Sequence, residues 1–380
     1  MASRGPSVTL PPGYFIKREL DARNWSQVDL ADIIQRPLQL VNEIIAGKRS
    51  ITPETALGLS QAFDTGPQYW LNLQSAYDLS KAGHTDPGVA LRARLYAKAP
   101  VKEMAKRGWI ASVIDAGALE ASLLQFFDLK TLEDEPSFWG HAARKSTSYF
   151  ETTPGQLAWL FQARHVARDL EVSGSFSAKA LDAALSELQR LLEVPTDVAR
   201  VPEILSRAGI RCVVVEPLPQ IRIDGACFWL AADKPCIAMS LRYDRIDYFW
   251  YTLMHELGHV FARDGWQGEG EPLDMDLVGQ QAATSESKPP FEQNADQFAV
   301  SQLVPQDELA NFIARSRPHY SRAKILAFAQ RFNVHPGIVV GQLQHRHEIL
   351  YSHSRDLLVK VRNLITGVAR TDGWDPIPAL

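Results

Sequence analysis

Two histidines one helical turn apart are the residues with the clearest chemistry in this chain. They lie in His255-Glu256-Leu257-Gly258-His259, an H-E-x-x-H sequence. Side chains four residues apart share one helix face, so both imidazoles can approach one metal ion. Glu256 lies one step round, where its carboxylate can touch a water on that ion. Zinc hydrolases need two imidazoles, a third protein ligand, an open position and such a base.

The segment that carries these histidines is predicted to be a largely buried helix. Apolar residues recur at three- and four-residue spacing over residues 245–263, which favours a packed helix over a surface helix with two solvated histidines. Asp244 is the expected N-cap, and Asp264-Gly265 the expected end. Gly258 inside a helix costs about 1 kcal/mol relative to Ala. We therefore expect something to pack closely there, such as a strand or a substrate.

A third metal ligand is expected downstream. Residues 264–287 hold six acidic side chains and no Lys or Arg, and this composition predicts a flexible acidic loop. Glu292 differs because it opens a segment with a buried helical pattern, where Asp296 lies four residues further on. We predict that Glu292 binds the metal and that Asp296 orients a ligand histidine without touching the ion. Glu286 is the second choice, and a first-turn acid favoured by the helix dipole is the alternative for Glu292.

The H-E-L-G-H sequence followed by E-x-x-A-D-x-F-A-x-x-x-L-x-P resembles the ImmA/IrrE family of zinc metallopeptidases. The resemblance runs from about Val201 to the mid-340s. It implies one zinc ion held by His255, His259 and Glu292, with Glu256 as the catalytic general base. It also implies action on regulatory proteins such as repressors. The long acidic loop between the ligands departs from the family pattern, and such a loop can screen the site or restrict substrates.

Three β-rich runs precede the histidine helix, at Arg211–Leu218, Gly225–Ala231 and Pro235–Leu241. Turn signals at Asp224-Gly225 and at residues 233–235 separate them. They predict a small sheet packed on the H-E-x-x-H helix. One edge of this sheet can pair with an extended peptide, or the strands can serve as core alone.

A second signal lies near the amino terminus. Residues 25–31 and 41–49 predict two short helices with a tight connection. Ser26 suits the N-cap of the first helix, Pro37 the first turn of the second, and Gly47 its end. The I-T-P-E-T-A-L and W-L-N-L-Q sequences further on complete a resemblance, over about residues 10–80, to helix-turn-helix domains of the XRE class. The similarity is greatest to antitoxins of the HigA type.

The second of these two helices is expected to read operator DNA in the major groove. Gln39 and Asn42 can pair with adenine edges, and Leu40 can meet a thymine methyl group. Gln27 and Lys48 are expected at phosphates.

The charge balance and the residue in the turn are also compatible with a helix-turn-helix that does not bind DNA. Residues 1–90 hold eight basic and nine acidic side chains, a balance of 8 − 9 = −1. Residues 91–107 carry six basic residues against one acid, a local +5, which is either an arm along DNA or a solvated helix face. Gln35 lies where many helix-turn-helix sequences have Gly. A helix-turn-helix used for protein contacts is the alternative.

The whole-chain features predict a cytoplasmic protein. Its net charge is −4 over 380 residues, and its three cysteines lie in the predicted sheet without ligand spacing, which indicates reduced thiols. No apolar run has the length of a membrane span, so no membrane partner is expected, and the first residues lack a signal-peptide core. His345 is a possible contributor near the zinc, while His347 and His353 have no assigned role.

Together these features predict a mostly helical α+β protein. We expect an all-α helix-turn-helix domain at 10–80, a helical connector at 81–200, a zincin-like domain at 201–350 and a C-terminal tail at 351–380. The expected function is a DNA-binding regulator whose zinc-activated water cleaves a regulatory protein or the chain itself, and the chain is expected to form a homodimer. The alternative is a HigA-like antitoxin and repressor that binds a small toxin and uses zinc for structure or sensing.

Overall fold

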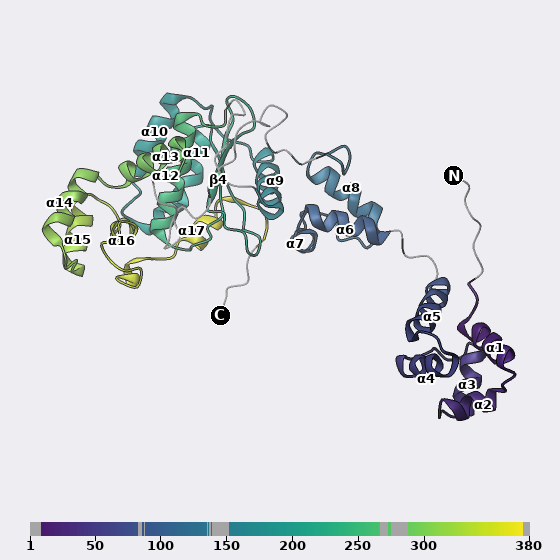
Figure 1. Ribbon diagram of the computed structural model, residues 1–380. Coiled ribbons are helices and arrows are strands. Elements are labelled where there is room, and N and C mark those ends of the chain that lie inside the picture. Colours follow the sequence, from purple (N-terminus) through teal and green to yellow (C-terminus); the bar gives the residue numbers. More distant parts are fainter. Residues whose placement is uncertain are drawn as a thin grey trace. The chain divides into compact units, whose positions relative to one another are not determined.

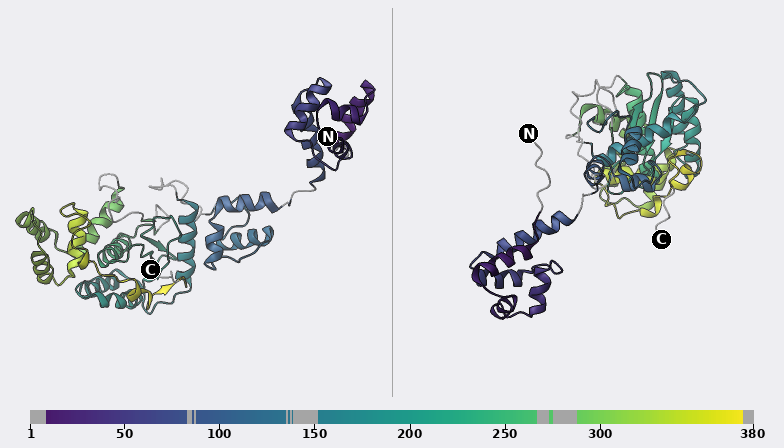
Figure 2. Two further views of the ribbon diagram at one scale, coloured as in Figure 1. Left: turned by 90° about the horizontal axis from the view of Figure 1, so that it is seen from below. Right: turned by 90° about the vertical axis from the view of Figure 1, so that its right-hand side faces the viewer.

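The computed structural model describes residues 9–82, 86, 88–134, 136, 138, 152–266, 273–274 and 288–374. The chain divides into two compact units, Met1–Ala90 and Leu91–Leu380, which can be followed separately in Figure 1 and in the further views of Figure 2. No helix within these described ranges combines the length and the apolar character that crossing a membrane requires.

The first unit is all helical. Its helices are α1 (Pro12–Arg23), α2 (Gln27–Ile33), α3 (Leu38–Ile45), α4 (Pro53–Phe63) and α5 (Pro67–Lys81). Trp70 is fully buried at the centre, where its ring lies 5.7 Å from that of Phe63. Gly13 lets α1 approach the end of α3, because a Cβ at that position would lie 2.2 Å from the Ile45 carbonyl oxygen.

The α2–α3 connection has the predicted boundaries. The Ser26 hydroxyl oxygen accepts a hydrogen bond from the Asp29 backbone N–H, and the Ser26 backbone N–H donates to the Asp29 carboxylate, which makes a capping box. Pro37 precedes the first residue of α3, and Gly47 follows its end with a φ of +68°. Gln35 has a φ of +51°, a left-handed conformation that favours glycine. The turn therefore keeps its backbone shape at this position without the usual glycine.

The second unit contains the sheet and the remaining helices. The helices are α6 (Gly88–Lys98), α7 (Val101–Lys106), α8 (Ala116–Phe126), α9 (Pro154–Arg168), α10 (Ala178–Gln189), η2 (Pro195–Arg200), α11 (Val201–Arg207), α12 (Ile246–Ala262), α13 (Pro290–Leu303), α14 (Gln306–Ser316), α15 (Arg322–Arg331), α16 (Pro336–His345), η4 (Arg355–Leu357) and α17 (Arg362–Thr366). The strands are β1 (Arg211–Val214), β2 (Gly225–Trp229), β3 (Pro235–Met239), β4 (Leu273–Asp274) and β5 (Arg370–Thr371).

The five strands form one sheet in the order β4-β2-β3-β1-β5. Strand β1 runs parallel to β3 and β5, whereas β2 runs antiparallel to β3 and β4. Alternate residues enter two different cores: Val214 and Ile237 pack with α10–α13, while Val213 and Ala238 pack with α9. Figure 1 shows these helices on opposite sides of the sheet. The predicted small sheet against the H-E-x-x-H helix is confirmed, and helices cover both of its faces.

The described residues between 91 and 200, which belong to the connector expected at 81–200, share a core with this sheet. Phe126 and Phe161 pack in the same cluster as Val213 and Phe228. The Trp159 indole donates to the Val215 carbonyl at 2.9 Å. At the other end, β5 lies within the expected tail and pairs with β1. The expected boundaries at residues 200 and 350 therefore fall inside one compact unit.

Asp244 was the expected N-cap of the histidine helix, and this prediction is wrong. Helix α12 begins at Ile246 after an extended Arg245, without a side-chain cap. The Asp244 carboxylate instead accepts the backbone N–H groups of Val361 and Arg362 at 2.8 and 2.7 Å. It therefore fastens the C-terminal segment to the start of α12.

Gln35→Gly tests the strain in the helix-turn-helix connection. Glycine adopts a positive φ without steric cost, so we expect the first unit to gain about 1 kcal/mol of unfolding free energy. Hydrogen exchange at the α2 and α3 amides of the full chain measures the change. Gln61→Gly, at an exposed position in the last turn of α4, is the control and should lose up to about 1 kcal/mol. A loss at position 35 equal to that control would contradict the strain.

Candidate functional site

The three residues predicted to bind a metal lie close together, two on α12 and one on α13. His255, His259 and Glu292 are buried, and one ligand atom from each lies within 4.8 Å of the other two. The two Nε2 atoms are 3.0 Å apart, and Glu292 Oε2 lies 3.2 Å from His255 Nε2 and 3.7 Å from His259 Nε2. Three ligands about 2.0–2.1 Å from a tetrahedral zinc lie about 3.3–3.4 Å from each other. These separations fit that geometry; metal binding by the three residues stays a prediction.

Each histidine has a carboxylate behind it. His255 Nδ1 lies 3.0 Å from Asp296 Oδ1, and His259 Nδ1 lies 2.8 Å from Asp264 Oδ2. An ionised carboxylate only accepts, so each Nδ1 carries the hydrogen and each Nε2 presents a lone pair toward Glu292. Three acceptors at such separations repel each other unless a cation, either a proton or a metal ion, lies among them. This donor set suits zinc.

The electrostatics of the two acids on α13 agree with a site for positive charge. Burial raises the pKa of Glu292, but a proton held on the neighbouring imidazoles of His255 and His259 outweighs burial and lowers it overall. Burial also raises the pKa of Asp296, whereas His255 and Lys288 lower it to about 2. Both groups are therefore ionised at neutral pH.

Asp296 is held by more groups than the sequence suggested. The Tyr251 hydroxyl donates to its Oδ1 at 2.7 Å, and the Lys288 ammonium donates to its Oδ2 at 2.6 Å. Lys288 offsets one negative charge in a cluster that also contains Glu292 and Asp264. Tyr251 lies four residues before His255 on α12, which is the spacing that identifies it as a neighbour of the site.

Asp264 is a candidate site residue that sequence reasoning missed. The sequence predicts it only as the end of the helix and as the first acid of the acidic loop. Arg263 closes α12 with a φ of +59°, and this left-handed residue turns the chain back so that Asp264 reaches His259. A carboxylate five residues after a ligand histidine, just beyond the helix end, is the available signal. Glu286 and nearly all of the acidic loop lie outside the described residues.

Glycines shape the walls around the ligands. A Cβ at Gly258 would lie 3.2 Å from Ala295 Cα and 3.2 Å from Phe298 Cδ1. The close neighbour expected there is therefore helix α13, which carries Glu292, and neither a strand nor a substrate. A Cβ at Gly225 would lie 2.1 Å from Glu256 Oε1. Gly225 thus opens β2 beneath the buried Glu256 carboxylate, at the first residue of the run predicted to be β-rich.

The residues predicted to contact DNA divide into two groups. Gln39, Asn42 and Lys48 are exposed on or just after α3, while Gln27 is half-buried at the start of α2. The Gln39 amide donates to Glu43 at 3.0 Å. Leu40 packs against the core of the first unit and is only partly exposed. Of the residues expected to contact bases, Gln39 and Asn42 are therefore the two whose side chains are exposed on α3.

Several basic side chains of the run at 91–107 form ion pairs or hydrogen bonds within the second unit. Arg94 pairs with Glu133 at 2.8 Å, and Lys98 donates to the Asp134 carbonyl at 3.0 Å. Arg107 donates to the carbonyls of Glu216 and Pro217. These contacts favour a structural use of the run over an arm along DNA. His345 is exposed, with its ring 6.3 Å from that of Tyr251, and it lies outside the ligand set.

Comparison with known families agrees with both parts of the chain. Residues 16–70 match the helix-turn-helix family, and residues 206–344 match the IrrE N-terminal-like domain family. An uncharacterised HTH-type transcriptional regulator of Escherichia coli K12, YddM, is 36% identical over 74 residues, which cover 20% of this chain and 79% of that protein. The chain belongs to the helix-turn-helix regulators and carries an IrrE N-terminal-like domain. The resemblance to both families is thereby confirmed.

Other relatives also align with the first unit. Virulence-associated protein A' of Dichelobacter nodosus is 40% identical over 73 residues, covering 19% of this chain and 64% of that protein. An addiction module antidote protein of the HigA family from Coxiella burnetii is 41% identical, covering 20% of this chain and 82% of that structure with a TM-score of 0.19. The Pseudomonas aeruginosa antitoxin HigA with its promoter is 35% identical, covering 20% and 82%, also with a TM-score of 0.19.

Asp264→Asn tests whether the missed carboxylate supports a metal site. Loss of the acceptor behind His259 should weaken zinc binding about 10–100-fold, because such partners fix the tautomer and basicity of a ligand imidazole. Competition with a chelating dye measures the affinity. Asp182→Asn, an exposed change on α10, is the control and should bind as the parent does. Equal affinities for the two variants would contradict the assignment.

Proposed function

We propose that the second unit is a zinc-dependent metallo-endopeptidase domain, acting within a DNA-binding regulator on a regulatory protein or on the chain itself. The observation that carries this proposal is the convergence of His255, His259 and Glu292 between α12 and α13, with a carboxylate behind each imidazole. The match of residues 206–344 to the IrrE N-terminal-like family supports the same chemistry.

The residues of the site have distinct tasks in this proposal. His255, His259 and Glu292 would hold the ion, and zinc, when bound, activates water and polarises the scissile carbonyl. Glu256 accepts a proton from the attacking water and returns it to the leaving amine. Its carboxylate is fully buried against Gly225, and this confinement keeps the base in place. Asp296 and Asp264 keep the two imidazoles neutral and oriented.

The first unit would bring this activity to an operator. Gln39 and Asn42 lie exposed on α3, where amide side chains can form paired hydrogen bonds with adenine. Lys48 would contact the phosphate backbone. Proteins of this kind bind paired half-sites, so we propose a homodimer that works in the cytoplasm. Cleavage of the regulator or of a bound protein would then change transcription.

Glu256→Gln separates catalysis from metal binding. Without the base, proteolysis should fall about 10²–10⁴-fold, while zinc content stays at that of the parent. Mass spectrometry of new protein N termini in the source cells, together with the intact mass of the purified chain, measures cleavage. Glu203→Gln removes an exposed carboxylate on α11 and is the control.

Two results of this experiment would exclude proteolysis by the site. One is an unchanged set of new N termini in the Glu256→Gln strain. The other is an unchanged regulatory output with zinc still bound, which would favour the antitoxin-like alternative, in which the domain binds a toxin and zinc serves structure or sensing. A protein that co-purifies with the Glu256→Gln variant would identify the substrate or the toxin.

Asn42→Ala tests the reading face of α3. Removing an amide that pairs with adenine should weaken binding to the operator by about 1–3 kcal/mol. Fluorescence anisotropy at fixed salt, with DNA selected by the protein itself, measures this loss. Asn72→Ala on the exposed face of α5 is the matched control and should leave affinity unchanged. Equal affinities for the two variants would remove α3 from the interface.

A further inference from the structure

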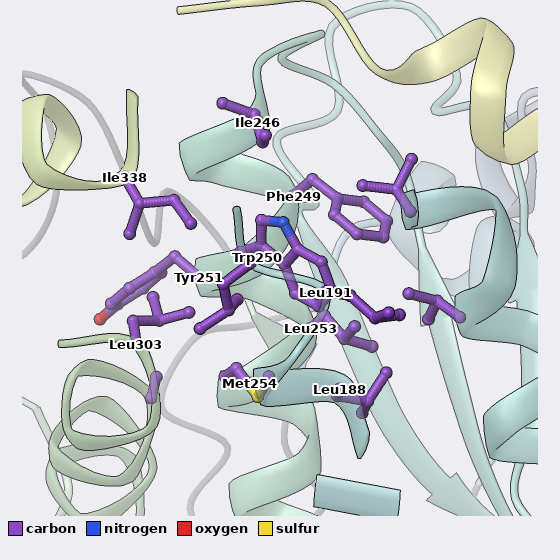
Figure 3. Close-up of a cluster of buried hydrophobic side chains, with 14 of the residues drawn as sticks. Leu188, Leu191, Ile246, Phe249, Trp250, Tyr251, Leu253, Met254, Leu303 and Ile338 are labelled. Carbon is purple, nitrogen blue, oxygen red and sulfur yellow. The ribbon is translucent and has the colours of Figure 1, made fainter. Parts of the chain in front are cut away.

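Helix α12 is packed along most of its length but not at its end. Every residue over 246–260 is buried. Figure 3 shows the helix between Leu188 of α10 and Leu303 of α13. Residues 261–263, by contrast, are exposed. Because helix ends fray where packing stops, the turn that carries Asp264 needs contacts of another kind to stay in place.

Two contacts with His259 hold Asp264 to the end of its own helix. The Asp264 backbone N–H donates to the His259 carbonyl at 3.0 Å, which is the closing bond of a left-handed helix terminus. The Asp264 carboxylate lies 2.8 Å from His259 Nδ1. Both contacts are with one residue of α12, so neither of them ties the turn to another element.

Two tryptophan indoles fasten the same turn to the sheet. Trp229, the last residue of β2, donates its Nε1–H to the Asp264 carbonyl at 3.0 Å. In the opposite direction, the Trp266 indole donates to the carbonyl of Ala232, between β2 and β3, at 2.9 Å. The half-buried Trp229 ring is itself held, because it meets the Phe176 ring edge-on with the centroids 5.4 Å apart. The sheet therefore presents Asp264 with a fixed donor.

The same strand also contacts the carboxylate proposed as the base. Gly225 lies at the other end of β2, where a Cβ would be 2.1 Å from Glu256 Oε1. All five residues of β2 pair with β3, which holds the two ends of the strand at a constant separation. Strand β2 thus touches the metal centre twice, at Glu256 directly and at His259 through Asp264.

We propose that Trp229 is a positioning residue of the metal centre. Its indole N–H holds the Asp264 carbonyl and so keeps the carboxylate of the same residue behind His259 Nδ1. A carboxylate in that place orients a ligand imidazole and raises its basicity. Without the indole N–H the turn moves more freely, and His259 presents its Nε2 lone pair to the metal less steadily. This inference rests on the metal centre of the proposed function, but not on peptide cleavage.

Trp229→Phe tests the proposal, because it removes the donor and keeps an aromatic ring against Phe176. We expect the dissociation constant for zinc to rise about three- to tenfold, since the Asp264 carboxylate remains and only its position relaxes. Competition with a chelating dye measures this affinity. The visible absorption of the cobalt-loaded chain should change as well, because it reports the geometry of the ligands.

Trp159→Phe is the matched control. It also removes an indole donor to a backbone carbonyl, that of Val215 at 2.9 Å, but in the core on the other face of the sheet. Its zinc affinity and cobalt spectrum should be those of the parent, although it loses the same kind of hydrogen bond. A second comparison uses Asp264→Ala. Adding Trp229→Phe to that variant should leave the zinc affinity within about twofold, because no carboxylate remains to be positioned.

The possible results separate this proposal from the proposed function. Parental zinc affinity of Trp229→Phe, beside weakened binding by Asp264→Ala, overturns the role of Trp229 and leaves the metal centre standing. Equal losses in Trp229→Phe and Trp159→Phe overturn it too, because the effect is then one of general stability. It is also overturned if Trp229→Phe weakens binding as much in the Asp264→Ala chain as in the parent. A parent that binds no zinc overturns both proposals.

Discussion

Three hydrogen-bond acceptors that face each other between α12 and α13 are the constraint on which the second unit depends. Two imidazole lone pairs and the Glu292 carboxylate lie 3.0–3.7 Å apart in a buried place. Such an arrangement is stable only around positive charge, because unpaired acceptors repel strongly where water is excluded. The close packing of Gly258 against α13 keeps the two helices near enough for this convergence.

Partners further out make the arrangement rigid. The Asp296 carboxylate is contacted by the His255 imidazole and the Tyr251 hydroxyl, both on α12, and by the Lys288 ammonium just before α13, so two segments meet on one carboxylate. Asp264 plays the corresponding part for His259 from beyond the end of α12. Within these contacts Lys288 offsets one negative charge, and a divalent cation is the natural complement of the rest. A metal bound here therefore couples α12, α13 and the start of the acidic loop, and its binding free energy stabilises their packing.

Local spacing made much of this site predictable from the sequence. His255 and His259 follow from the period of one helix, and Glu292 and Asp296 from the same four-residue spacing on another. The sheet and the α2–α3 turn were predictable because alternation and capping are also local patterns. Contacts between segments were not predictable in this way. Three features depend on pairing across long stretches of chain: Gly225 beneath Glu256, Asp244 on the C-terminal segment, and the packing of α8 and α9 on the sheet.

The most direct test of the account is the metal content and ligand set of protein purified without chelators and resupplied with zinc. Elemental analysis should give one zinc per chain, and X-ray absorption should show two imidazole nitrogens and carboxylate or water oxygen at about 2.0–2.1 Å. Replacing His255 by Ala should abolish that signal. A chain that holds no stoichiometric metal after resupply, or a zinc signal that survives the loss of His255, would contradict the account.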